Sequence, residues 1–225
     1  MNYNKNRIAK NIISSILIVL IFCFSFITIV NFTFNFMLVQ TNVRGFSMQP
    51  TINSNITDSN AEGDKIYINK YATLTNNDIV VASVDWYGHH IIKRVVGTPG
   101  DRVEIKDLGE NFGVFVNNNL LYTKEKYGDN GYEKTGSYAY FEDYNEFLKT
   151  LHFQNNVERD SDGTRIVLHE NEYLLMGDNW GHTTDSITKG VVNRNEILGK
   201  VEIIVDVENN NPFYVTLQLL KLIFS

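Results

Sequence analysis

The 225-residue sequence contains a single cysteine, Cys23, so no intrachain disulfide can form. Stability must therefore come from a packed core rather than from covalent cross-links. The chain is long enough for one sizeable core, or for one domain that carries an insertion. With 43% hydrophobic and 20% charged residues, the composition is that of a globular protein and not of a disordered one.

The sequence is also short of basic residues. It has 20 Lys+Arg residues against 26 Asp+Glu residues, and three of these cations lie before Asn11. Without those three, 17 basic residues remain against 26 acidic ones, a net charge of −9. Such an acidic domain opposes binding to nucleic acid, and its contact with a membrane is not polybasic.

Motifs for binding metal ions are absent from the sequence as well. Five histidines are present, including the adjacent pair His89 and His90 and the single His182. They form no His-x-x-x-His pair, and there is no set of cysteine ligands. We therefore expect neither a metal site nor another cofactor.

What the sequence does contain is one long apolar run near its N-terminus. Ile12–Val30 has 19 residues without a charge, and a helix of ~1.5 Å per residue would roughly span a hydrocarbon core of about 30 Å. Lys5, Arg7 and Lys10 precede this run, so the positive-inside rule predicts a cytoplasmic N-terminus, an anchor over residues 12–39 and an extracellular remainder. The alternative is a cleavable signal peptide, whose apolar core would be about 7–15 residues and would end in small residues.

After the anchor, short runs of β-branched and aromatic residues alternate with turn signals, which predicts a mainly β fold with antiparallel strands. Asp78–Val84 and His90–Val96 flank a tight turn and predict a hairpin. From Lys124 to Asp162, Gly, Asn, Asp and Tyr dominate and only Glu142–Leu151 has helical spacing, so we interpret this part as an inserted α+β lid region. The predicted organisation is a cytoplasmic N-terminus (1–11), a transmembrane anchor (12–39), a β domain in two parts (40–123 and 163–211), the insertion (124–162) and an apolar tail (212–225).

Two segments carry candidate chemistry in the first half of the chain. Ser47 lies in Gly45–Thr51, where Gly45 permits close approach of the backbone and Pro50 stiffens the loop; taken alone, this is also an ordinary surface turn. Lys93 lies within an apolar strand run, so strand alternation points it either to solvent or to the core. Burial would lower its pKa from ~10.4, and a neutral amine could then take a proton from a serine.

A third segment, Met176-Gly177-Asp178-Asn179, is followed by Thr183, Asp185 and Ser186, and would by itself be read as a turn. In their order and spacing, the three segments resemble the conserved boxes of type I signal peptidases, the Ser-Lys enzymes that cut signal peptides from exported proteins. The family pattern runs Ser-Met-x-Pro-Thr, Lys-Arg-Val-x-Gly-x-Pro-Gly-Asp, Gly-Asp-Asn…Ser-x-Asp-Ser and Gly-Lys-Val. It corresponds here to Ser47–Thr51, Lys93–Asp101, Gly177–Ser186 and Gly199–Val201, with Glu62-Gly63-Asp64 at an intervening box.

The resemblance implies a β catalytic domain of the signal-peptidase type with an inserted lid region, preceded by one transmembrane helix. It implies a serine endopeptidase of the cell membrane that cuts exported precursor proteins after small residues. Ser47 would be the nucleophile, with its backbone N–H in the oxyanion hole, and Lys93 would be the general base. Gly45 and the single anchor are similar to the Gram-positive branch, and Gly45 lacks the serine donor that some relatives have there.

The remaining site residues would support this pair. The resemblance implies that Asp185 pairs with Arg94, that Ser186 is structural, and that Thr183 replaces a serine that hydrogen-bonds the lysine. Asp178 and Asn179 complete the supporting group.

Besides Thr183, two further positions depart from the family pattern, because Trp180 and Ile187 stand where the family usually has arginine. They indicate a diverged paralogue with a narrow set of clients. The alternative is a non-catalytic relative that binds precursors or assists surface or pilus assembly. A self-cleaving Ser-Lys regulator is a third class, but it would be cytosolic and would bind DNA, which the anchor and the negative charge oppose.

Overall fold

The computed structural model describes residues 2–125, 155–160 and 163–209, together with the single positions 214, 217, 218, 220 and 221. The chain divides into two compact units, Met1–Val39 and Gln40–Ser225.

The first unit consists mainly of one helix, α1 (Asn2–Met37). Within it, Lys10–Val30 is a 21-residue stretch with a mean hydropathy of 2.8, long and apolar enough to cross a membrane. The predicted anchor extended to residue 39, but the helix ends at Met37. Leu38–Asn42 is extended because its β-branched Val39 and Thr41 favour a strand.

A seven-stranded sheet forms one half of the second unit, with the order β1-β2-β12-β3-β4-β10-β11. Pairs β3–β4, β4–β10, β10–β11, β2–β12 and β3–β12 are antiparallel. The predicted hairpin over residues 78–96 is the β3–β4 pair. The strands are β1 (Leu38–Asn42), β2 (Lys65–Asn69), β3 (Ile79–Ala82), β4 (Ile91–Gly97), β10 (Glu172–Met176), β11 (Val192–Asn193) and β12 (Ile197–Val205).

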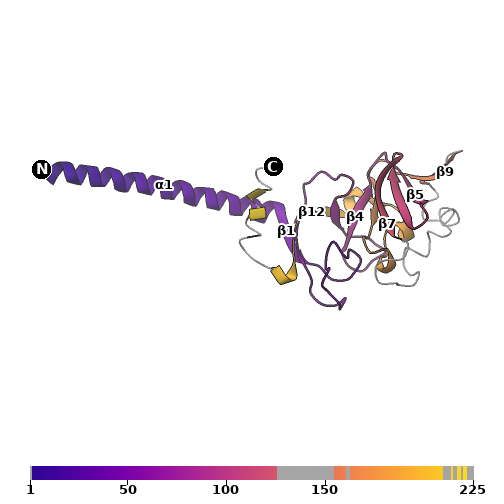
Figure 1. Cartoon of the computed structure of the whole chain (residues 1–225). Coiled ribbons are helices and arrows are strands. Elements are labelled where there is room, and N and C mark those ends of the chain that lie inside the picture. Colours follow the sequence, from indigo (N-terminus) through magenta and orange to yellow (C-terminus); the bar gives the residue numbers. More distant parts are fainter. Residues whose placement is uncertain are drawn as a thin grey trace. The chain divides into compact units, whose positions relative to one another are not determined.

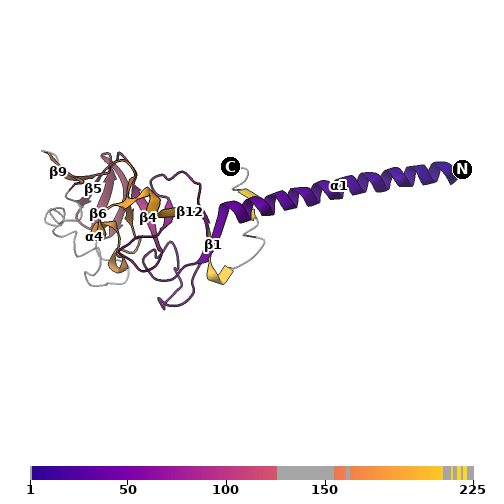
Figure 2. The ribbon, with the colours of Figure 1, turned by 180° about the vertical axis from the view of Figure 1, so that it is seen from behind.

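The other half is a five-stranded antiparallel sheet with the order β7-β6-β5-β9-β8. Asn117 and Asn118 have φ values of 51° and 69°, the left-handed conformation that a two-residue hairpin turn between β6 and β7 requires. In Figure 1, β5, β7 and β9 stand together at one end of the domain and β4 and β12 at the other, and Figure 2 gives the same arrangement from behind. The strands are β5 (Arg102–Asp107), β6 (Asn111–Val116), β7 (Asn119–Glu125), β8 (Val157–Asp160) and β9 (Gly163–Val167).

Two sheets of antiparallel strands confirm the predicted mainly β fold. Short helices lie in the connections of the second half: η2 (Trp180–His182), α4 (Ser186–Lys189), η3 (Arg194–Glu196) and η4 (Val207–Asn209). Most of the predicted insertion, 126–154 and 161–162 with its helical stretch 142–151, lies outside the described residues, whereas β8 falls within its predicted bounds. The predicted tail 212–225 is described only at five single positions.

One core cluster joins the two sheets. It unites apolar side chains of β4 and β10 with those of β5, β6 and β9, and it also contains two residues of the third segment, Trp180 and Ile187. A second cluster packs Ser47's neighbours, Met48 and Ile52, against β2 and β12. The loop Gly45–Thr51, called the nucleophile loop after the role expected of Ser47, and the third segment are therefore both held by buried apolar contacts.

Candidate active site

Ser47 lies in the loop between β1 and β2, and its neighbours anchor that loop in the core. Met48 is 3% and Ile52 is 1% exposed. Gly45 has a φ of +86°, which a residue with a side chain adopts only with strain. Its carbonyl oxygen accepts a hydrogen bond from Asn53 Nδ2 at 3.0 Å, which fixes the approach to the serine.

Asn53 is a residue of this site that the sequence analysis missed. Its N–H donates to Asp64 Oδ2 at 2.7 Å, and the Asp64 N–H donates back to Asn53 Oδ1 at 2.8 Å. A Cβ atom on Gly63 would lie 2.0 Å from Asn53 Oδ1, so only glycine fits beside it. The Gly63-Asp64 pair was recognised in the sequence, but nothing in the sequence identified Asn53 as its partner.

Lys93 shares its face of β4 with the buried Ile91 and Val95, as the alternation of side chains along a strand requires. Its side chain is therefore directed to the core and not to solvent, and the residue is 3% exposed. Lys93 Nζ lies 2.8 Å from Ser47 Oγ and donates to the Ile92 carbonyl oxygen at 2.9 Å. A hydroxyl within hydrogen-bond distance of a buried amine is an arrangement that can activate a nucleophile.

The burial of Lys93 favours the loss of its proton. Burial lowers the pKa of Lys93 to about 8, although the negative charges of Asp185 and Asp178 oppose this shift. Asp185 itself is 0% exposed, and its burial raises the pKa of its carboxyl group. An amine with a pKa near 8 is partly neutral at physiological pH and can act as a base.

Arg94 forms its ion pair with Asp178, not with Asp185 as the resemblance implied. Arg94 Nε donates to Asp178 Oδ1 at 2.8 Å and Arg94 Nη2 donates to Asp178 Oδ2 at 2.6 Å. Thr51, in the nucleophile loop, donates to the same carboxylate. The reason is the register of the sheet: Met176 on β10 pairs with Arg94 on β4, so Asp178, two residues later, lies beside the guanidinium.

Asp185 has a different partner set. Its side chain caps α4 by accepting the Ile187 N–H at 3.1 Å, and it also accepts the Gly177 N–H at 3.0 Å. The next residue, Ser186, accepts the Leu175 N–H at 2.9 Å and so ties α4 to β10. Asp185 thus fixes the backbone of the third segment and places a negative charge near Lys93.

Thr183 does not make the hydrogen bond to the lysine that the resemblance implied. Among the residues that the structure describes, its buried Oγ1 makes no hydrogen bond of standard geometry. Thr183 interacts with Asp185 instead, and this interaction partly offsets the rise that burial causes in the pKa of Asp185. A Cβ atom on Gly177 would lie 2.3 Å from this Oγ1 and 2.6 Å from the Ser47 carbonyl oxygen. Gly177 therefore lets the third segment lie directly against the nucleophile loop.

The two residues that stand in place of family arginines are both buried. Trp180 is 1% and Ile187 is 0% exposed, and both belong to the core cluster that joins the two sheets. Apolar packing thus occupies the positions where arginines were expected. Asn179, which precedes Trp180, donates its N–H to the Ser47 carbonyl oxygen at 3.0 Å.

His182 is a further residue at the site whose surroundings the sequence did not predict. Its ring packs against Phe46 in a T-shaped contact with ring centroids 6.5 Å apart. Within the described ranges 2–125, 155–160 and 163–209, no group of three or more His, Cys, Asp and Glu side chains is arranged to hold a metal ion.

Comparison with known proteins gives the following similarities. The family described as "Signal peptidase, peptidase S26" matches residues 11–206. Signal peptidase I P of Bacillus subtilis subsp. natto is 26% identical over 181 residues, covering 76% of this chain and 77% of that protein. Signal peptidase IB of Staphylococcus aureus is 27% identical over 176 residues, covering 74% of this chain and 76% of that protein. The crystal structure of a signal peptidase I from Enterococcus faecalis V583 has a TM-score of 0.36 and 18% identity, covering 57% of this chain and 97% of that one.

Proposed function

The chain belongs to the signal peptidase family, peptidase S26, and on this premise we propose that it is a membrane-anchored serine endopeptidase that removes signal peptides from exported precursors. Ser47 is the nucleophile and Lys93 is the general base. The observation that supports these roles is the 2.8 Å distance between Lys93 Nζ and Ser47 Oγ at a lysine that is 3% exposed. The reaction needs no cofactor.

In the proposed reaction, Ser47 Oγ attacks the scissile carbonyl carbon while its proton passes to the neutral Lys93 amine. Because one N–H of that amine is held by the Ile92 carbonyl oxygen, its lone pair can face the serine. The Ser47 backbone N–H donates to the oxyanion, an interaction whose loss typically costs about 3 kcal/mol. Lys93 then protonates the leaving amine, and a water molecule hydrolyses the acyl-enzyme with Lys93 again as base.

The N-terminal unit suits the proposed anchoring. Lys10–Val30 is long and apolar enough to cross a bilayer. Lys5 and Arg7 precede it without an acidic residue, which favours a cytoplasmic N-terminus and an extracellular β domain. In the sequence, Ser47 follows the last residue of this helix by ten residues.

A cleavage assay tests the proposal. The full-length chain in detergent or liposomes is incubated with exported precursors whose signal peptides end in small residues. We expect the wild type to cut them, and Ser47→Ala and Lys93→Met to lose at least about 1,000-fold in rate. Ser54→Ala and Lys70→Met change an exposed serine and an exposed lysine and serve as matched controls. Cleavage by the Ser47 or Lys93 variant at the wild-type rate would refute the proposed catalytic dyad of Ser47 and Lys93.

The non-catalytic alternative was based on the replacements at positions 180 and 187. Both side chains are packed into the core rather than taking the place of a group of the dyad. The two replacements therefore leave Ser47 and Lys93 in place and do not support a non-catalytic protein. If no precursor in the panel were cut while precursors still bound, the alternative would become the better account.

A further inference from the structure

The third segment, Met176–Ser186, is tied to the nucleophile loop by its backbone. The Asn179 N–H donates to the Ser47 carbonyl oxygen at 3.0 Å. A Cβ atom on Gly177 would lie 2.6 Å from the same oxygen, so the two backbones are in contact there. A displacement of the third segment would therefore move the main chain of the nucleophile.

The secondary structure of this segment is too short to fix it. The helix η2 has three residues, and its N-cap residue Asn179 makes no capping hydrogen bond with its side chain. A single turn of 3₁₀-helix is not stable by itself, because nucleation is costly and its hydrogen bonds have poor geometry. Contacts from outside the segment must hold η2 in place.

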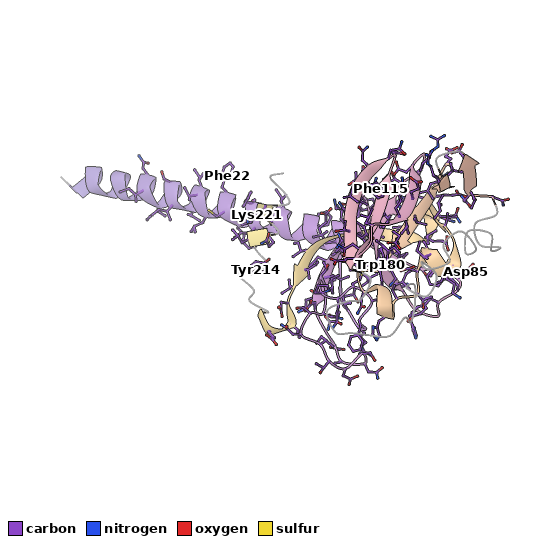
Figure 3. The ribbon with its side chains drawn as sticks, turned by 45° about the vertical axis from the view of Figure 1, so that its right-hand side comes forward. Phe22, Asp85, Phe115, Trp180, Tyr214 and Lys221 are labelled. Atoms are coloured by element: carbon purple, nitrogen blue, oxygen red, sulfur yellow. The ribbon has the colours of Figure 1, made fainter. Side chains whose placement is uncertain are left out.

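Trp180, the first residue of η2, makes these contacts. It is 1% exposed and has the largest side chain among the fully buried residues that the structure describes. Its ring centroid lies 6.3 Å from that of Phe112 on β6 and 6.2 Å from that of Tyr122 on β7. Figure 3 labels Trp180 in the interior of the β domain. Both partner rings belong to the five-stranded sheet, which carries neither member of the dyad.

Tyr122 also interacts with the third segment and with the charged groups of the site. Its hydroxyl donates to Met176 Sδ at 3.9 Å. Burial raises the pKa of Tyr122, and the carboxylates of Asp178 and Asp185 raise it further. The same two carboxylates act on the pKa of Lys93, so Tyr122 and Lys93 share charged neighbours.

We propose that Trp180 is a positioning residue: clamped between Phe112 and Tyr122, it holds the third segment against the nucleophile loop and keeps Ser47 Oγ within reach of Lys93. The inference rests on the proposed function, since the position of Ser47 matters only if it reacts. A misplacement of about 1 Å can cost roughly 100-fold in rate. Loss of the indole therefore slows the chemical step and leaves the surface that binds the precursor unchanged.

A role in stability alone predicts a different result. Truncation of any large buried side chain lowers the melting temperature, so stability does not distinguish the two roles. The distinguishing quantity is kcat at matched loss of stability. Ile166 supplies the control, because it is 0% exposed and lies in the same core cluster, but on β9, away from the third segment in the chain.

The experiment compares Trp180→Ala, Trp180→Phe and Ile166→Ala in the full-length chain, with kcat and KM for a precursor-derived peptide and the melting temperature of each. We expect Trp180→Ala to lower kcat by about 100-fold with KM within about twofold. Trp180→Phe keeps an aromatic ring against Phe112 and Tyr122, and we expect it to retain kcat within about fivefold. Ile166→Ala should lose stability but keep kcat.

Equal losses of kcat in Trp180→Ala and Ile166→Ala would overturn the positioning role, as would a rise in KM at constant kcat. If Trp180→Ala does not fold, Trp180→Leu replaces it, with Ile166→Val as its control and the same two outcomes. If the wild type cuts no precursor, the proposed function fails. If the wild type cuts and Trp180→Ala behaves as the control, only the positioning role fails.

Discussion

The two sheets of the β domain contribute in different ways to the site. The seven-stranded sheet carries ionisable groups: Lys93 and Arg94 are neighbours on β4, and Lys200 lies on β12. The five-stranded sheet turns an apolar face to the core, made of Val103, Ile105, Phe112, Val114, Val116 and Ile166, each at most 6% exposed. The first sheet thus carries the proposed base, and the second supplies Phe112 and Tyr122, the rings that Trp180 contacts.

Two lysines within the seven-stranded sheet show why burial decides which one can react. Lys200 Nζ lies 2.9 Å from Asp78 Oδ1, and this hydrogen bond raises its pKa. Lys93 is more deeply buried, and its pKa falls to about 8. Of these two lysines, only Lys93 loses its proton near neutral pH.

The third segment contacts the nucleophile loop through its backbone at Gly177. The substitution Gly177→Ala would disrupt this contact. The new Cβ atom would lie 2.6 Å from the Ser47 carbonyl oxygen, so the nucleophile loop must move. We expect kcat to fall by about 100-fold in the cleavage assay. Gly181→Ala is the matched control, because its nearest neighbour is an Asn179 side-chain oxygen at 3.8 Å. Equal activity of the two variants would contradict the contact.

The ion pair between Arg94 and Asp178 joins β4 to the third segment, and Asp178→Ala would remove it. The two side chains are 20% and 13% exposed, so we expect the free energy of unfolding to fall by about 2 kcal/mol. If the same amount is lost in the transition state, kcat falls by about 30-fold. The control Glu62→Ala breaks an ion pair whose side chains are both 62% exposed and should cost less than about 1 kcal/mol. Equal losses in chemical denaturation would show that the partly buried pair has no special role.

The pH dependence of cleavage tests whether Lys93 titrates as the base. Lys93 must be neutral to act as base, and its pKa of about 8 predicts a rate that rises about tenfold from pH 7 to pH 9. Because the unfolded lysine titrates near 10.5, the folded state gains stability as pH rises from about 8 to 10.5, and this gain is lost again as pH falls back to about 8. Lys93→Met should abolish that gain in melting experiments. A rate that is flat between pH 7 and pH 9 would exclude Lys93 as the titrating base.

The smallest effect on cleavage is expected inside the five-stranded sheet. Ile166→Val removes one methylene from a fully buried position and should cost about 1 kcal/mol of unfolding free energy. We expect kcat and KM to stay at their wild-type values, because the packing of Trp180 is retained. A kcat loss larger than twofold would mean that packing within the five-stranded sheet affects Ser47 and Lys93 by a route other than Trp180.

Much of the site follows from patterns in the sequence, but its pairings do not. The ordered segments located Ser47, Lys93 and Asp185, and the structure brings them together. The family resemblance paired Asp185 with Arg94, whereas the partner of Arg94 is Asp178. Spacing along the chain cannot distinguish two carboxylates seven residues apart, because the choice depends on the register of β10 against β4.

The sequence by itself determined the apolar helix, the alternation of the strands and the identity of the segments around Ser47 and Lys93. These features arise from local patterns: an uncharged run, a period of two, and short motifs with fixed spacing. The tertiary structure decided that Lys93 is buried, that Asp178 rather than Asp185 pairs with Arg94, and that Trp180 packs between the rings of a second sheet. Burial and pKa depend on neighbours far apart in the chain, and only the folded sheets bring those neighbours together.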